Sequence, residues 1–245
     1  MSTNKDFLIQ LASLQDRIKA ACERADRPSA SSGYSCSVEP EVQLMAVTKT
    51  HPAEMADWAL DAGLKHIGEN RVQEAAGKIP EVKNKTGYWE LIGPLQSNKA
   101  RVAVNAFSRI QTVDRIKLVN VLDRICGEEG RAELPVLLQA NVGEDPSKHG
   151  CTTDMAKALA EAILGSQHLK LEGLMTIGEF TDEEVRVRRT FSRLRELRDT
   201  LQDELGASLP VLSMGMTGDL EWAIEEGSTL IRVGTALFGE RGTAR

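Results

Sequence analysis

The sequence has 245 residues and a formal net charge of −6, with 41% hydrophobic and 27% charged residues. These proportions are typical of an ordinary soluble globular protein, and the length is the usual size of one α/β barrel. The negative charge argues against a nucleic-acid partner, because non-specific binding needs clustered lysines and arginines that release counterions from phosphates.

The sequence also argues against a membrane or secreted protein. Its apolar runs are far shorter than the roughly 20 residues that cross a bilayer, and residues 1–19 mix charged and apolar side chains throughout, unlike a secretory signal. The cysteines, Cys22, Cys36, Cys126 and Cys151, are scattered without a C-x-x-C pair, so we expect neither a disulfide framework nor a zinc site. We predict a cytoplasmic protein with no membrane partner.

The first predicted element is an amphipathic helix at residues 4–25, where apolar side chains recur at helical spacing. Residues 27–40 are rich in Ser, Pro and Gly and predict a flexible loop. We assign residues 1–26 to an extra N-terminal helix of the same domain, since so short a segment cannot bury a core alone. We expect this helix to cover the barrel wall between the last strand and the first.

From residue 42 onward, short apolar stretches alternate with segments of helical pattern. The apolar stretches predict eight strands, at Val42–Thr48, Lys65–Gly68, Trp89–Gly93, Ser108–Val113, Leu134–Asn141, Leu171–Ile177, Leu209–Met214 and Thr229–Val233. Helices are predicted between them at segments such as Pro52–Ala62, Ile116–Glu129, Thr153–Leu164, Asp182–Leu205 and Gly218–Glu226.

Strand and helix alternating in this way imply right-handed parallel units. Eight such units in about 200 residues fit a closed (β/α)8 TIM barrel better than an open doubly wound sheet, which is the alternative. Only residues 236–245 follow the last predicted strand, too few for a full eighth helix. We therefore predict one α/β domain over residues 1–245, a TIM barrel with the extra N-terminal helix.

Lys49 lies where the apolar run of the first predicted strand stops, within the stretch VQLMAVTKTHP at residues 42–52. In parallel α/β proteins the carboxyl ends of strands carry the chemistry. The last predicted strand offers a second cluster, because Arg232 lies within it and Gly234 and Thr235 follow at its end.

The loops after strands 7 and 8 of a barrel form a common phosphate site. Here the loop at residues 213–219 supplies Ser213, Gly215 and Thr217, while Gly234 and Thr235 follow strand 8. In a closed barrel strand 1 neighbours strand 8, so an amine, a phosphate cradle and a fixed cation come together. This combination is what a protein needs to hold pyridoxal 5′-phosphate.

The sequence resembles the pyridoxal-phosphate homeostasis proteins (the YggS/PROSC-type family), which share the barrel of alanine racemase. The likeness covers roughly residues 43–239 and rests on the segments AVTKTHP (46–52), IGENRVQE (67–74), LIGPLQSNK (91–99), GLMTI (173–177), LSMGMTGDLEWAI (212–224) and GSTLIRVGTALFG (227–239). Two positions depart from the family pattern as we expect it: Glu90 stands where a histidine is common, and His149 where a small residue is usual.

The resemblance implies a role for each matching position. Lys49 would form the Schiff base with pyridoxal 5′-phosphate, and Arg232 would face its pyridine nitrogen. The implied phosphate contacts are Ser213, Thr217, Gly234 and Thr235, and the implied ring contacts are Asn70 and Met175. From the residues alone, Asn70 is equally a candidate helix cap.

An arginine at the pyridine nitrogen weakens the ring as an electron sink and leaves racemisation as the feasible reaction. Two-base racemisation needs a second proton donor, which in alanine racemases is a tyrosine from an added β-domain. The chain ends shortly after Gly239, so we expect no such domain, and neither Tyr34 nor Tyr88 is predicted at a strand end.

The resemblance therefore implies a monomeric cofactor carrier without robust catalysis. It would act in intracellular pyridoxal-phosphate (vitamin B6) and amino-acid homeostasis and make transient contact with pyridoxal-phosphate-dependent apo-enzymes. The alternatives are a low-activity amino-acid racemase and a phosphate-sensing or partner-binding module.

Overall fold

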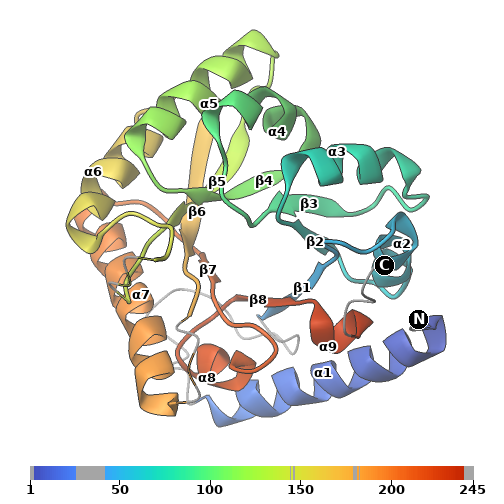
Figure 1. Cartoon of the computed structure of the whole chain (residues 1–245). Coiled ribbons are helices and arrows are strands. Elements are labelled where there is room, and N and C mark those ends of the chain that lie inside the picture. The colour runs from blue at the N-terminus through green and yellow to red at the C-terminus, as the bar shows by residue number, and fades with distance from the viewer. Residues whose placement is uncertain are drawn as a thin grey trace.

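The computed structural model describes residues 3–25, 42–143, 145, 147–178, 181 and 183–239 of the chain. Its strands close into a parallel barrel in which β1 to β8 follow one another in chain order, and β8 pairs with β1 (Figure 1). The predicted TIM barrel is confirmed, and the open-sheet alternative is wrong because β8 and β1 leave no sheet edge. The predicted loop at residues 27–40 lies outside the described residues.

Each observed strand overlaps one predicted apolar stretch. The strands are β1 (Gln43–Val47), β2 (His66–Glu69), β3 (Tyr88–Leu91), β4 (Arg109–Val113), β5 (Leu134–Gln139), β6 (Leu169–Met175), β7 (Val211–Ser213) and β8 (Leu230–Val233). The strands form the barrel wall, and the loops that follow them lie at its carboxyl end.

The helices form the outer layer. They are α1 (Asn4–Arg24), α2 (Ala53–Asp61), α3 (Val72–Glu81), η1 (Ser97–Lys99), α4 (Ala100–Ala106), α5 (Ile116–Glu128), α6 (Thr153–Leu164), α7 (Glu184–Leu205), α8 (Leu220–Glu225) and α9 (Thr235–Phe238). The helices named from the sequence did not include α3 and α4. α3 contains Pro80, and α4 is only 7 residues long, so neither has an uninterrupted helical pattern.

Helix α1 covers the wall between the last strand and the first, as predicted. It lies along α8 and α9 (Figure 1). The Phe7 ring is stacked on Phe238 of α9, with centroids 5.5 Å apart, and lies 6.3 Å from Trp58 of α2. Its buried stripe repeats at three- and four-residue spacing and consists of Phe7, Leu11, Leu14, Ile18 and Ala21.

The barrel interior is partly polar. Met45, Val47 and Leu230 form a small apolar cluster separate from the large core between strands and helices. Gln111 of β4 and Ser213 of β7 hydrogen-bond to each other although their strands are not neighbours, so both side chains cross the barrel interior. Barrel interiors are usually packed with branched apolar side chains, so these polar groups need a functional explanation.

Among the described residues, none of the helices has the length and apolar character needed to span a membrane.

Candidate functional site

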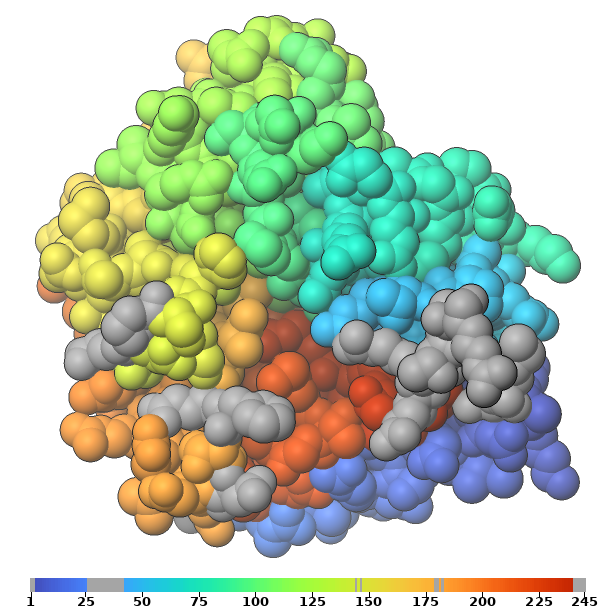
Figure 2. Space-filling view, in the orientation of Figure 1, coloured from blue at the N-terminus to red at the C-terminus, as the bar shows by residue number. Residues whose placement is uncertain are grey.

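The candidate site lies at the carboxyl ends of β1 and β8. These strands pair with Met45 opposite Arg232 and Ala46 opposite Val233, so Gly234 is level with Val47. A Cβ atom on Gly234 would lie 3.1 Å from the Val47 carbonyl oxygen, closer than a side chain normally packs. Glycine therefore lets the segment after β8 press against β1. Figure 2 shows the red segment after β8 between the blue segment after β1 and the orange loop after β7.

Lys49 lies in the turn after β1 and is half-buried. The next residue, Thr50, has a φ of 64°, a left-handed conformation that is uncommon for a non-glycine residue. Behind the turn, the Thr48 hydroxyl donates to Glu69 at 2.7 Å, and the Lys78 ammonium donates to the Thr48 carbonyl at 2.7 Å. These buried bonds fix the position of the turn that carries Lys49.

The Lys78 ammonium also donates to the Glu69 carboxylate, at 2.5 Å. Burial raises the pKa of Glu69, although the hydrogen bonds from Lys78 and Thr48 oppose that rise. Oε2 of Glu69 is buried and has no hydrogen-bond partner among the described residues. The turn is therefore supported by a buried ion pair that is only partly satisfied.

Arg232 is buried inside the barrel, with 5% of its surface exposed. Its Nη1 donates to the Ser213 hydroxyl at 2.7 Å, and its Nη2 donates to the Thr176 carbonyl at 2.8 Å. Burial lowers the pKa of Arg232 to about 10, and the charge of Asp219 opposes this. The guanidinium stays protonated at neutral pH and is held in one orientation by β6 and β7.

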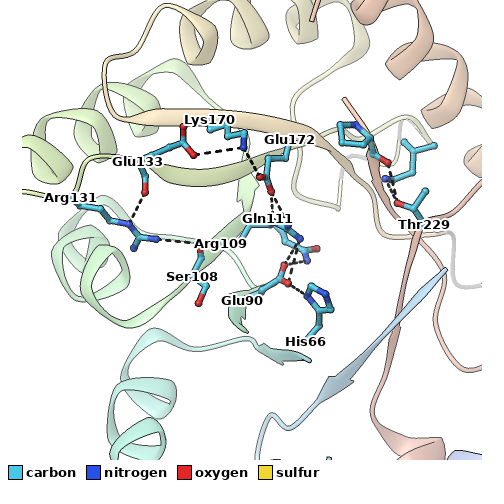
Figure 3. Close-up of polar contacts among 12 residues, drawn as sticks. His66, Glu90, Ser108, Arg109, Gln111, Arg131, Glu133, Lys170, Glu172 and Thr229 are labelled. Carbon is cyan, nitrogen blue, oxygen red and sulfur yellow. Dashed lines mark hydrogen bonds and ion pairs between the residues drawn. The ribbon is translucent and has the colours of Figure 1, made fainter. Parts of the chain in front are cut away.

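A chain of hydrogen bonds continues from Arg232 through the barrel. The Ser213 hydroxyl donates to Oε1 of Gln111 at 2.6 Å, and Nε2 of Gln111 donates to Glu90 at 2.7 Å. Glu90 also contacts Nδ1 of His66 at 2.5 Å and Nη1 of Arg109 at 3.2 Å (Figure 3). Sequence reasoning noticed Glu90 only as a departure and missed Gln111, which no motif marks. It assigned no role to Thr176, although Thr176 lies in the matching segment at residues 173–177.

The charge of Glu90 gives this chain its direction. Burial alone would raise the pKa of Glu90, but the hydrogen bond from His66 and the positive charge of Arg109 lower it overall. An ionised carboxylate only accepts hydrogen bonds, so the Gln111 amide must turn its nitrogen toward Glu90 and its oxygen toward Ser213. The Ser213 oxygen is then left to accept from Arg232.

The other predicted phosphate residues lie in the loops after β7 and β8. Gly215 has a φ of 94°, and a Cβ atom there would lie 2.5 Å from the Cβ of Ala223, so only glycine fits. Thr217 is half-buried, and its carbonyl accepts a hydrogen bond from Arg17 at 3.0 Å. Thr235 begins α9 without a side-chain cap, so the first amides of that helix are not capped by a side chain.

Asn70 and Met175 also lie at carboxyl strand ends. Asn70 follows β2, but α3 begins at Val72 with Arg71 as its N-cap and no side-chain cap bond, so the capping role considered for Asn70 is wrong. Met175 is fully buried and pairs with Ser213. All eight predicted site residues therefore lie at the carboxyl half of the barrel, although the Ser213 hydroxyl is already occupied by Arg232 and Gln111.

The remaining candidates lie elsewhere or form no site. Tyr88 is the first residue of β3, at the amino end of the barrel, and is 54% exposed. Tyr34 lies outside the described residues. Cys126 and Cys151 are buried free thiols, and the described part of the chain contains no group of three or more His, Cys, Asp or Glu placed to hold a metal.

Comparison with known proteins identifies the family of the chain. The family model "Alanine racemase, N-terminal domain" matches residues 35–242. The chain is 43% identical over 244 residues to the pyridoxal phosphate homeostasis protein of Pseudomonas aeruginosa, covering 98% of this chain and 97% of that protein.

Two solved structures place the fold. PipY of Synechococcus elongatus, solved with PLP bound, superposes with a TM-score of 0.80 at 36% identity, covering 95% of this chain and all (100%) of that one. Alanine racemase of Clostridium difficile superposes with a TM-score of 0.76 at 13% identity, covering 98% of this chain and 58% of that one. The second likeness concerns the fold alone.

Proposed function

The chain belongs to the family of pyridoxal phosphate homeostasis proteins, and we propose that it binds pyridoxal 5′-phosphate as a Schiff base on Lys49. Support comes from PipY, the structure with PLP bound, at 36% identity over 95% of this chain. The proposed pocket is formed by the carboxyl ends of β1, β2, β6, β7 and β8.

The residues present fit this cofactor. Lys49 supplies a half-buried amine on a fixed turn, and Arg232 supplies a cation beside it on the neighbouring strand. The phosphate would be held by Gly234, Thr235 and Thr217. Ser213 would act indirectly, because its hydroxyl accepts a hydrogen bond from Arg232 and orients that side chain. Asn70 and Met175 would line the ring. When bound, the cofactor supplies a reactive aldehyde and an electron-withdrawing ring.

One observation carries the proposed role: Arg232 is buried and held by Ser213 and Thr176, so it faces the site as a fixed donor. A protonated guanidinium gives no proton to a pyridine nitrogen, so the ring remains a weak electron sink. Binding is then favoured over transamination or decarboxylation. We infer a carrier that supports vitamin B6 and amino-acid balance and hands its cofactor to apo-enzymes through transient contacts.

The second candidate is a low-activity amino-acid racemase, which the alanine-racemase-like fold favours. Racemisation by two bases needs a donor on the face of the substrate opposite Lys49. Tyr88 is the one tyrosine in the described part of the chain, and it lies at the amino end of the barrel, away from Lys49. This placement favours the carrier. We also infer a monomer acting in the cytoplasm.

The test is absorbance and mass analysis of the purified full chain before and after borohydride reduction. We expect a visible absorption band and, after reduction, a pyridoxyl adduct on Lys49 that the Lys49→Ala variant lacks. Lys99→Ala, which removes another half-buried lysine, is the matched control and should keep both signals. An adduct that persists in Lys49→Ala would contradict the assignment.

A second experiment separates carrier from racemase. The loaded protein is mixed with a pyridoxal-phosphate-dependent apo-enzyme, and the recovered activity of that enzyme is measured. In parallel, L-alanine is incubated with the loaded protein and D-alanine is quantified. Transfer with negligible D-alanine supports the carrier, whereas D-alanine at ordinary enzyme rates would overturn it.

A further inference from the structure

The opposite end of the barrel holds a cavity. It has a volume of about 430 Å³, within the range of small-molecule sites. Among the residues that line it are His66, Tyr88, Glu90, Arg109, Arg131 and Glu172. His66, Tyr88 and Arg109 are the first residues of their strands, so the cavity opens at the amino ends, away from Lys49.

The positive side of this cavity is Arg131. Its guanidinium donates to four backbone carbonyls, those of Val104, Phe107, Ser108 and Glu133. These bonds hold the group in place without neutralising it. One Nη2 hydrogen remains for a ligand. Among the described residues, Arg131 makes no ion pair with a carboxylate, so its charge is available to an anion that enters the cavity.

The other side is net negative. Arg109 bridges two carboxylates, with Nη2 2.7 Å from Glu172 and Nη1 3.2 Å from Glu90. One guanidinium therefore faces two acids, and the ring of His66 also contacts Glu90, at 2.5 Å. Lys170 also lies 3.4 Å from Glu172, but its side chain is 53% exposed and does not line the cavity. The lining is thus polarised, with a cation at Arg131 and excess negative charge at Glu90 and Glu172.

This polarity selects the ligand. A phosphate dianion would suit Arg131 but would be repelled by Glu90 and Glu172, and a simple amine would face Arg131 without a partner. A molecule with one carboxylate and one ammonium a few bonds apart satisfies both sides. We propose that this cavity binds a zwitterionic α-amino acid, with its carboxylate on Arg131 and its ammonium on Glu172, beside the buried Glu90.

The proposal does not depend on the cofactor, because the cavity shares no lining residue with the candidate site at Lys49. It also gives the charged side chains of this cavity a function, which is to bind the ligand. Glu90 is also the acceptor that orients Gln111, Ser213 and, through them, Arg232. An amino acid in the cavity would lie next to the far end of that hydrogen-bond chain.

The binding test uses the full chain with Lys49→Ala, so that no amino acid can react at the proposed Schiff-base position. L-alanine, propionate and ethylamine are titrated by calorimetry, since the last two each keep one charge of the zwitterion. We expect L-alanine to bind at one site. Each single-charge compound should bind with an affinity lower by about tenfold or more, because a charge-assisted hydrogen bond is lost.

Three variants in the same background locate the site. Glu172→Gln keeps the side-chain shape and should weaken L-alanine binding about tenfold while leaving propionate unchanged. Lys170→Gln removes a neighbouring charge outside the cavity and should bind L-alanine normally. Arg131→Lys keeps a positive charge and tests the contact with the carboxylate of L-alanine. Circular dichroism checks that α4 persists.

Three results would overturn the proposal: no saturable L-alanine binding, propionate binding as tightly as L-alanine, or Glu172→Gln binding L-alanine as well as the unaltered cavity does. If the proposed cofactor chemistry at Lys49 failed, this test would be unaffected. The two proposals therefore stand or fall separately.

Discussion

The Ser213 hydroxyl and the Gln111 side chain, 102 residues apart in the sequence, share a hydrogen bond of 2.6 Å inside the barrel. This bond joins the carboxyl half of the barrel, where Arg232 lies, to Glu90. Every link in the chain has a defined donor and acceptor, so the orientation of Arg232 depends on residues remote from Lys49.

Replacing Gln111 by Met should break this chain. Ser213 and Glu90 would each lose a buried partner, which costs about 1–3 kcal/mol of unfolding free energy for each unsatisfied group. The pH dependence of the visible absorption of bound cofactor should also change, because Arg232 is less firmly held. Chemical unfolding and an absorbance titration measure the two effects.

Gln139→Met is the matched control for that change. Gln139 is also buried in the barrel, but its amide donates to the His149 carbonyl at 3.2 Å and takes no part in the chain. We expect a loss of stability with an unchanged absorbance titration. Equal titrations for Gln111→Met and the unaltered protein would refute the positioning role.

Glu90 should stabilise the protein in a pH-dependent way. Its folded-state pKa is lower than its ordinary value of 4.5, because His66 and Arg109 outweigh burial. The contribution is therefore fully present above pH 4.5 and is lost as the pH falls through the lower folded value. In Glu90→Gln, the difference in unfolding free energy from the unaltered protein should shrink as the solution is acidified below pH 4.5.

Glu69 offers a comparison of opposite sign. Burial raises its folded-state pKa above 4.5, so its ionised form is disfavoured in the folded protein and the penalty is relieved by acidification. Urea unfolding should show that the unaltered protein gains stability relative to Glu69→Gln as the pH falls from above the raised folded-state pKa toward 4.5. Parallel pH profiles for the two variants would show that these environments are misassigned.

Gly234→Ala should weaken cofactor binding. The added Cβ would lie 3.1 Å from the Val47 carbonyl, so the segment after β8 must shift away from β1 by a few tenths of an ångström. We expect a loss of affinity of about tenfold, since small displacements at a preorganised site are costly, measured by titration with pyridoxal 5′-phosphate. Gly77→Ala is the control, because nothing lies within 4 Å of the new Cβ in helix α3. It should raise the free energy of unfolding by about 0.5–1 kcal/mol.

Helix α1 should be an integral part of the barrel. Phe7→Ala removes a fully buried ring that packs on Phe238 and Trp58, and should cost about 3–5 kcal/mol. Leu8→Ala, at a position 49% exposed, should change stability by less than about 0.5 kcal/mol. Thermal unfolding compares the pair, and equal melting temperatures would show that α1 is dispensable.

The sequence alone determined the architecture and the positions of the candidate residues along it. The strand–helix period predicted all eight strands, because buried strands need short apolar runs and these are local features. It also placed Lys49 and Gly234 after their strands and Arg232 within β8, since a strand end is recognisable where the apolar run stops.

Only the tertiary structure decided which polar side chains meet inside the barrel. Gln111 lies in no segment of the resemblance, and the sequence near Glu90 and Thr176 does not indicate their partners, which lie on strands distant in sequence. Their contacts depend on which face of each strand points inward and on the register at closure, and a slip of one residue would turn each side chain outward. The charged cavity at the amino ends also depends on tertiary structure, because Arg131, Arg109 and Glu172 come together only when β4, β5 and β6 pair side by side.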